Sequence, residues 1–429
     1  MLEFININKI LNEFQFGFRK NHNTTQPVIH FLDKIYNSLN SNEPKFTISI
    51  FLDLKKAFDT TCHTILLEKL EHYGFRGISL EWFKNYLRER QQVVCINNTV
   101  SSSRNITVGV PQGSILGPLL FLIFINCLPN SVNFFTLLFA DDTTFQMSNR
   151  SLKDLFINAN KQLEKASEWF TSNKLTLNVS KTKYIVFRPK NWQEKTKNYT
   201  QKIGNESIEG IGEDLPLKSF KFVGLVIDEN LSWKYHISKI KSKLAYTGLL
   251  ISKCKNILPK DTLITLYNAL FKPHLEFCII VWGSASKSLL KPIILSQKKC
   301  VRNICKKGHT SHTEPLFRKL KILKVEDIYD YHCKIFMHNI VHKCPESFRN
   351  MFTRSVSNRT NNIVIEKCKN KFLSQFPSNI LPVKWNELPL DLKSETSIKK
   401  FKENIFSSIL DSYCPKEFCN RVNCPDCRR

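Results

Sequence analysis

The chain has 429 residues, of which 42% are hydrophobic and 23% charged, so it can bury a substantial core and is not a disordered basic tail. Its 63 Lys and Arg against 37 Asp and Glu give a formal net charge of +26, which favours a folded protein that binds a polyanion, above all a nucleic acid. Residues 1–150 hold 14 basic and 12 acidic side chains, so almost all of the excess lies downstream.

The sequence also argues against several cellular settings. Its longest apolar stretches, such as 119–125, are far shorter than the roughly 18–20 residues that a transmembrane helix needs. The N-terminal segment carries Glu3 inside its apolar patch and no small-residue cleavage site, so a secretory signal is not expected. The 14 cysteines stand mostly alone in apolar segments, which is typical of core thiols in a reducing compartment. We expect a nuclear or cytoplasmic protein that is neither secreted nor membrane-spanning.

The first elements alternate between strand and helix patterns. Residues 46–53 place apolar side chains at every second position, which predicts a buried strand that ends at Asp53. Residues 63–90 have helical periodicity, interrupted at Gly74 and Gly77, and residues 119–128 are a candidate apolar helix.

The middle of the chain begins with a predicted hairpin over 134–147 that carries two acids at its turn. Ser151 and Asp154 then form a capping-box pattern ahead of a long amphipathic helix. A strand is predicted over 183–187, and residues 190–214 are polar enough to predict a long loop.

The rest of the chain changes character. From residue 232 onward the pattern is mostly helical and basic, with lysines around apolar positions over 234–255. The last third is rich in Pro, Asn and Ser, and we expect it to be loosely organised.

Three aspartates carry the chemical hypothesis: Asp53 at the end of one buried strand, and Asp141 and Asp142 at the turn of the hairpin. Carboxylates held close together repel one another, and a divalent metal ion is the usual compensation. Paired Mg²⁺ ions are the device by which polymerases hold the attacking and leaving oxygens of a phosphoryl displacement. Read alone, an Asp-Asp pair is more often a solvated turn.

Several stretches stand in order along the chain: Gln-Phe-Gly-Phe-Arg at 15–19, Leu-Asp-Leu-Lys-Lys-Ala-Phe-Asp at 52–59, Gly-Val-Pro-Gln-Gly and its apolar continuation at 109–121, Phe-Ala-Asp-Asp at 139–142, Asn-Val-Ser-Lys-Thr-Lys at 178–183 and Phe-Val-Gly at 222–224. In this order and spacing they resemble the motifs of a reverse transcriptase. The whole chain, from about residue 14 to about residue 410, resembles the polymerase of non-LTR retrotransposons, the Jockey-like LINE elements.

The resemblance implies an α+β fold, the right-hand polymerase architecture, with an antiparallel palm sheet, packed helices and partial fingers, followed by a helical thumb and a mostly helical C-terminal region. The expected boundaries are 1–45 for residual fingers, 46–228 for the palm with fingers elements, 229–310 for a basic thumb and 311–429 for a C-terminal region with a Cys-containing tail. The basic helix over 234–255 would track the phosphates of a duplex, although a charged helix face is most often only solvated.

The resemblance also implies an enzyme, an RNA-directed DNA polymerase with two Mg²⁺ ions. Asp53, Asp141 and Asp142 would be the metal ligands, assisted by the carbonyl of Leu54. The reaction would be attack of a primer 3′-hydroxyl on the α-phosphate of a deoxynucleoside triphosphate. The implied partners are an RNA template, a DNA primer and the nucleotide.

Further roles follow from the same resemblance. Phe58 would be the aromatic gate that excludes a 2′-hydroxyl, and Gln112 and Gly113 would touch the nucleotide and template. Lys181 would protonate the leaving pyrophosphate, and the primer grip would comprise Phe222, Val223 and Gly224. Each also has an ordinary interpretation, respectively a core aromatic, a turn, a solvated lysine and a plain strand.

A second metal site is conceivable at the C-terminus. The spacing of four cysteines there is compatible with a zinc knuckle, although only the last two spacings are typical. The four are Cys414, Cys419, Cys424 and Cys427.

The chain departs from the family at its start. Only residues 1–14 precede the first matching stretch, and the Arg-Pro-Ile-Ser segment and the endonuclease of LINE elements are not found. We expect an N-terminally truncated polymerase. The alternative is a catalytically inactive nucleic-acid-binding remnant of such an element.

Overall fold

A six-stranded sheet frames the first half of the chain in the computed structural model, which describes residues 1–189, 194–344, 349, 351–352, 361–365 and 367–414. The spatial order is β6-β7-β1-β8-β10-β9. The central strand β1 is buried at all its positions and pairs antiparallel with β7 and β8, whereas β10 runs parallel to β8. The strands are β1 (Phe46–Leu52), β6 (Phe135–Phe139), β7 (Asp142–Asn149), β8 (Lys183–Phe187), β9 (Gln201–Ile203) and β10 (Glu206–Ile211).

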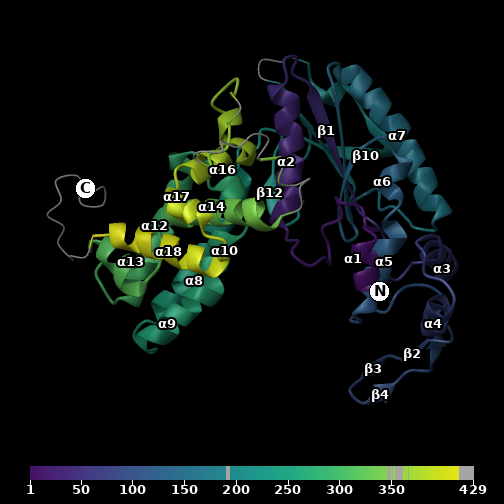
Figure 1. Cartoon of the computed structure of the whole chain (residues 1–429), viewed down its shortest axis with the longest axis horizontal. Coiled ribbons are helices and arrows are strands. Elements are labelled where there is room, and N and C mark those ends of the chain that lie inside the picture. The colour runs from purple at the N-terminus through teal and green to yellow at the C-terminus, as the bar shows by residue number, and fades with distance from the viewer. Residues whose placement is uncertain (190–193, 345–348, 350, 353–360, 366, 415–429) are drawn as a thin grey trace. The chain divides into compact units, whose positions relative to one another are not determined.

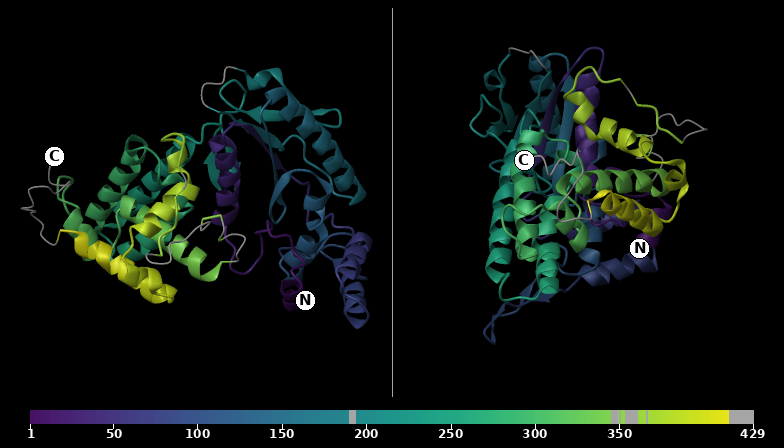
Figure 2. Two further views of the ribbon diagram at one scale, coloured as in Figure 1. Left: turned by 45° about the horizontal axis from the view of Figure 1, so that its top comes forward. Right: turned by 90° about the vertical axis from the view of Figure 1, so that its left-hand side faces the viewer.

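Helices cover both faces of this sheet, as Figure 1 and Figure 2 show. The alternation predicted for 46–53 explains why: Ile48 and Ile50 face the core cluster that includes α7, and Phe51 faces the opposite side, where it packs on Phe31 of α2 with ring centroids 5.9 Å apart. The helices of this part are α1 (Leu2–Ile7), α2 (Thr25–Asn40), α3 (His63–His72), α4 (Ile78–Leu87), α5 (Leu116–Ile125), α6 (Leu128–Ser131) and α7 (Leu152–Ser172).

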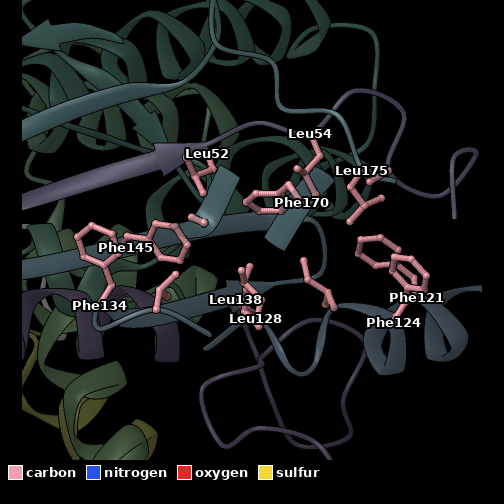
Figure 3. Close-up of a cluster of buried hydrophobic side chains, with 14 of the residues drawn as sticks. Leu52, Leu54, Phe121, Phe124, Leu128, Phe134, Leu138, Phe145, Phe170 and Leu175 are labelled. Atoms are coloured by element: carbon pink, nitrogen blue, oxygen red, sulfur yellow. The ribbon is translucent and has the colours of Figure 1, made fainter. Parts of the chain in front are cut away.

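The main core lies between the sheet and helices α5, α6 and α7. Figure 3 shows side chains of β1, β6 and β7 meeting those of these helices, among them Leu52, Phe145 and Phe170. The apolar run 119–125 is buried throughout, which confirms the predicted apolar helix and explains why it has no polar face. The core therefore holds the ends of β1 and β7 firmly.

Two helix-boundary predictions are confirmed. Gly74 and Gly77 separate α3 from α4 and have φ values of +95° and +57°, a region that favours glycine. The Ser151 hydroxyl accepts a hydrogen bond from the Asp154 amide at 3.2 Å and caps α7. The Ser151 amide itself donates to the Asn149 side chain at 3.2 Å, so the reciprocal bond of a capping box is replaced.

The prediction of a long loop over 190–214 is wrong for 194–214, the part of this range that the structure describes. Strands β9 and β10 form within it, and β10 is placed by its register against β8, where Gly210 lies opposite Tyr184. A Cβ atom at Gly210 would lie 2.6 Å from the Tyr184 ring, so only glycine allows this approach. The polar residues Glu206 and Glu209 are exposed, which hid the strand in the sequence. A short 3-10 helix, η1 (Thr196–Asn198), precedes the two strands.

The chain forms two compact units, Met1–Gly224 with Asp228–Asn230, and Leu225–Ile227 with Leu231–Arg429. Apart from the strand β12 (Leu225–Ile227), the elements in the described part of the second unit are helices, among which α8 packs against α12. These helices are α8 (Lys234–Cys254), α9 (Lys260–Leu266), the π-helix η2 (Tyr267–Phe271), α10 (Lys272–Glu276), α11 (Ile279–Trp282), α12 (Lys287–Ile304), α13 (Glu314–Leu320), α14 (Val325–Lys343), the 3-10 helix η3 (Leu373–Gln375), α16 (Pro377–Asn386), α17 (Leu390–Ser394) and α18 (Ile398–Ser412).

The expectation of a loosely organised last third is wrong for its described residues. Helix α14 packs on α16 and α18 and buries Trp385 and Phe401 almost completely. The prolines contribute to this order, because Pro377 is the first residue of α16 and Pro389 is the N-cap of α17.

Four short strands and a hairpin complete the structure. Strand β2 (Gln91–Gln92) pairs with β5 (Arg104–Asn105), and β3 (Cys95–Ile96) with β4 (Thr99–Val100). The hairpin consists of β11 (Phe220–Phe222) and β12 (Leu225–Ile227). The α+β class is confirmed, while the boundaries between fingers, palm, thumb and tail stay predictions. None of the helices in the described ranges is both long and apolar enough to cross a membrane.

Candidate active site

The three aspartates converge at one end of the two central strands. Asp53 directly follows β1, and Asp142 is the first residue of β7. Because Leu52 pairs with Thr143 in the antiparallel register, the chain positions that follow and precede this pair lie side by side. The strand and hairpin predicted from sequence therefore bring acids almost ninety positions apart to the same edge.

The turn that carries Asp141 is tight. Phe139 pairs with Asp142, so Ala140 and Asp141 alone connect β6 to β7. Ala140 has a φ of +58°, in the left-handed region that residues other than glycine seldom adopt. This conformation is energetically unfavourable for alanine, so contacts with the surrounding structure must hold the turn in place.

The acids interact electrostatically. Loss of surrounding water raises the pKa of the Asp141 carboxyl, and the charge of Asp53 adds to this effect. The same two causes, together with the charge of Asp141, raise the pKa of Asp142 to about 6, against a smaller opposing effect from Lys221. The cluster therefore holds more negative charge than its own cations offset, and a bound cation would relieve the repulsion.

The donor set suits a hard divalent cation, because carboxylate oxygens are the ligands that Mg²⁺ prefers. Within the described ranges, however, no three acid, His or Cys side chains already surround a single point as a metal site requires. The structure brings the acids to the same edge of the sheet but does not arrange them as a complete coordination shell.

The segment that contains Lys181 lies alongside the end of β1. The Asn178 amide donates to the Asp53 carbonyl at 2.8 Å, and the Lys55 amide donates to the Thr176 carbonyl at 2.9 Å. This pairing brings the Lys181 ammonium within 3.9 Å of an Asp53 carboxylate oxygen, with 72% of the lysine side chain exposed. The cation thus borders the acids and stays free to reach solvent.

Leu54 and Phe58 follow Asp53 into the next turn. Leu54 is buried and forms an isolated antiparallel bridge with Leu177. Phe58 is half-buried and packs on Phe121 of α5, with ring centroids 4.5 Å apart. This position agrees with both predictions for Phe58, a core aromatic residue and an aromatic gate beside the site.

The loop with Gln112 and Gly113 is fastened to the same turn. The Val110 amide donates to the Phe58 carbonyl at 2.8 Å, and the Gln112 side-chain amide donates to Asp59 at 2.7 Å. Gly113 has a φ of +81° and open space around it, as a glycine that leaves room for a ligand would. Both residues are exposed.

The segment predicted as a primer grip is a tight hairpin. Val223 and Gly224 form its turn with φ values of +42° and +91°, and the first of these is strained for a β-branched residue. Phe222 anchors the hairpin on the sheet, with its ring centroid 4.7 Å from that of Phe31 and 5.3 Å from that of Phe51.

Lys221 is a residue of this site that sequence reasoning missed. It is exposed between the packed rings of Phe220 and Phe222, and its charge lowers the pKa of Asp142. A lysine between two aromatic residues of a strand was the available signal, because alternation turns its side chain away from the face that the rings bury. Without the packing of the hairpin, the sequence could not indicate that Asp142 lies nearby.

The candidate zinc site lies mostly outside the described residues. Cys414 is buried at the end of the described part, and Cys419, Cys424 and Cys427 lie beyond it. The zinc hypothesis therefore stays a prediction.

Comparison with known proteins gives further evidence on the family of this chain. The family model described as reverse transcriptase (RNA-dependent DNA polymerase) matches residues 1–227. Two similar curated proteins of Drosophila melanogaster are the RNA-directed DNA polymerase from mobile element jockey, 27% identical over 335 residues, and the probable RNA-directed DNA polymerase from transposon X-element, 28% identical over 336. Each alignment covers 75% of this chain and 35% of the relative, so the chain spans about a third of the length of these proteins.

Two more distant similarities were also found. The putative 115 kDa protein in the type-1 retrotransposable element R1DM of the same fly is 23% identical over 304 residues, 67% of this chain and 28% of that protein. A solved structure of telomerase from Candida albicans aligns with a TM-score of 0.36 and 11% identity, over 82% of this chain and 55% of that one, which is too weak to establish a common fold. The family match spans more than half of the chain, and the resemblance to Jockey-like elements is confirmed: the chain belongs to the reverse transcriptase (RNA-dependent DNA polymerase) family.

Proposed function

We propose that this chain forms the catalytic part of an RNA-directed DNA polymerase, which extends a DNA primer with deoxynucleotides on an RNA template. The observation that carries the proposal is the convergence of Asp53, Asp141 and Asp142, where burial and then the mutual charges raise the pKa values of the last two. An excess of carboxylate at the end of two buried strands is unfavourable for the fold and is suited to holding cations.

The reaction is attack of the primer 3′-oxygen on the α-phosphate, with release of pyrophosphate. Two Mg²⁺ ions, when held by these carboxylates, supply charge stabilisation to the attacking and leaving oxygens. The side chains of Asp53 and Asp141 would hold these ions, and Asp142 would complete the acidic cluster. Lys181, which is 3.9 Å from Asp53 and largely exposed, donates a proton to the leaving pyrophosphate.

The nucleotide lies, in this proposal, against the turn that follows β1. The ring of Phe58, held by Phe121, leaves no space for a 2′-hydroxyl. The bond between Gln112 and Asp59 keeps the glycine-containing loop next to that ring. Most of the catalysis would come from such positioning, since phosphoryl transfer needs little covalent participation by the protein.

The nucleic acid is held by other parts of the chain. The sheet and its helices would act as the palm with elements of the fingers, and the hairpin with Phe222, Val223 and Gly224 would support the primer end. Helix α8 would be part of the thumb, because its exposed lysines surround a buried apolar stripe. Such a face binds phosphates without reading sequence.

The test is primer extension on an RNA template with Mg²⁺, using the chain and its Asp141→Ala variant. We expect extension by the chain and a loss of at least about 100-fold in the variant, the cost of removing a preorganised charged group. Asp154→Ala is the matched control, because that acid lies in the first turn of α7 and is not one of the three converging aspartates. No extension above Asp141→Ala, with salt-sensitive RNA binding retained, would overturn the proposal in favour of a silent nucleic-acid-binding protein.

A further inference from the structure

The turn that carries Asp141 is held by a side chain from the start of the molecule. The Gln15 side-chain oxygen accepts hydrogen bonds from the Ala140 amide at 3.1 Å and from the Gly17 amide at 2.9 Å. Gln15 is 1% exposed, so both bonds lie away from water. Without this oxygen, the Ala140 amide would be left as a donor without a partner beside the turn, which is unfavourable.

The backbone around Gln15 continues the sheet. Gln15 forms a parallel bridge with Leu138 of β6. The Phe16 amide donates to the Leu138 carbonyl at 2.8 Å, and the Leu138 amide donates to the Phe14 carbonyl at 2.9 Å. Residues 14–17 therefore fasten the last residues of β6 directly before the turn.

Gly17 lies against the turn itself. A Cβ atom at this position would be 2.3 Å from the Ala140 backbone nitrogen and 2.9 Å from its Cα. No side chain fits there unless the turn moves, because the atoms it would meet are backbone. The Arg19 guanidinium closes the segment on itself by donating to the carbonyls of Asn12 and Gln15, both at 3.0 Å.

We propose that Gln15 and Gly17 are positioning residues that hold the left-handed turn at Ala140 and thereby aim the Asp141 carboxylate. The inference rests on the proposed function, since it assigns these residues to the same site. Neither residue needs to touch the substrate. Small displacements of a reacting group are costly in phosphoryl transfer, so the effect of these contacts should appear in turnover and in the response to Mg²⁺.

The side chain of Gln15 offers a sharp pair of variants. Its oxygen makes both bonds, while its nitrogen is buried without a hydrogen-bond partner in the described part of the chain. Gln15→Met keeps the volume and removes the acceptor, whereas Gln15→Glu keeps the acceptor. We expect Gln15→Met to lower maximal extension about 30-fold, within the range for groups that orient metal ligands, with the KM for nucleotide nearly unchanged. Gln15→Glu should retain most of the activity.

Gly17→Ala tests the close approach independently. We expect a loss of maximal extension similar to that of Gln15→Met. Gly204→Ala, in the turn between β9 and β10, is the control, since its φ of +57° strains the backbone there but a Cβ atom meets nothing within 4 Å. Gln146→Met is the control for Gln15: that glutamine is equally buried in β7 but donates to the Phe31 carbonyl and the Ser49 hydroxyl, away from the turn.

The second readout is the rise of the melting temperature on titration with Mg²⁺, which needs no turnover. The wild-type chain and Gln146→Met should respond at the same Mg²⁺ concentration, although the control melts lower, and Gln15→Met should need about tenfold more. The inference would be overturned if Gln15→Met and Gly17→Ala both matched the wild-type chain in maximal extension and in the Mg²⁺ concentration that raises the melting temperature. If the wild-type chain fails to extend a primer, the proposed function falls, and the Mg²⁺ titration still decides the role of Gln15. A wild-type chain without a Mg²⁺ response overturns both.

Discussion

The two units of this protein place charge in opposite ways. In the first, acids from two distant stretches, Asp53 and Asp141 with Asp142, meet through the pairing of β1 with β7. In the second, Lys239, Lys241 and Lys243 are exposed on one helix, around an apolar stripe that is buried. The acidic site therefore depends on tertiary register, whereas the basic face depends only on helical periodicity.

This difference has a mechanical consequence. A site assembled from several segments fails when one contact is lost, because each group is held by only a few neighbours. A basic face acts through the sum of its charges, each of which is replaceable. Single substitutions in the first unit should therefore have larger effects than multiple substitutions in the second.

Outside the aspartates, the largest expected effect concerns Lys181. We expect Lys181→Met to lower maximal extension about 100-fold, the lower end of what a general acid contributes, with the KM for nucleotide within a few-fold of the original value. Single-turnover extension across a series of nucleotide concentrations measures both quantities. Lys165→Met, on the exposed face of α7, is the control. If Lys181→Met and Lys165→Met had equal maximal extension rates, Lys181 would be an ordinary solvated lysine without a role in the reaction.

The basic face of α8 should respond differently. Replacing Lys239, Lys241 and Lys243 by Gln should weaken duplex binding about tenfold at moderate salt and reduce the salt dependence by up to about 3 in log–log slope, because each lost phosphate contact removes about 0.9. Extension at saturating duplex should be unchanged. Fluorescence anisotropy against salt concentration measures the slope.

The control for this experiment is a second exposed lysine triplet, Lys399, Lys400 and Lys402 on α18, replaced in the same way. If both triplets change the salt slope of binding equally, duplex binding depends on the total charge of the chain, and α8 has no dedicated role in it.

A smaller effect is expected at Phe58. Phe58→Val should raise the use of ribonucleotides relative to deoxynucleotides about tenfold, the discrimination that a few atoms in a pocket provide. Competition between the two nucleotide types in extension measures the ratio. Phe121→Leu removes the packing partner of the ring and should lower the melting temperature with less change in selectivity. Unchanged selectivity in Phe58→Val would assign this ring to the core alone.

The smallest effect is on stability. The pKa of Asp142 is about 6 in the folded chain and is ordinarily near 3.8, so the folded state binds the proton more tightly than the unfolded state does. Stability from this group is therefore present at low pH and is lost as the pH rises from about 4 to about 6. We expect Asp142→Asn to melt a few degrees above the original chain at pH 7.5, with the difference vanishing near pH 4.

Thermal melting without Mg²⁺ across this pH range checks the sign, and Asp154→Asn serves as control. A lower melting temperature for Asp142→Asn at pH 7.5 would mean that the carboxylate stabilises the fold, and the picture of an acidic cluster that needs cations would fail.

Much of the first unit could be predicted because its signals are local. The alternation over 46–53, the glycines at 74 and 77 and the capping serine at 151 each act within a few residues. Strand β10 could not be predicted in this way, since its exposed face is polar and its register comes from β8. The tight packing of the last third could not be predicted from its prolines, because proline is common both in loops and at the starts of helices, where Pro377 and Pro389 lie.

The sequence by itself determined the α+β class, the family and the identity of the acids, because periodicity and motif order survive without knowledge of contacts. Only the tertiary structure decided that Gln15 holds the Ala140 turn and that the charge of Lys221 acts on Asp142. Both are interactions between residues that lie about 80 or more positions apart. No local pattern encodes such a contact, because it exists only once the strands have paired in register.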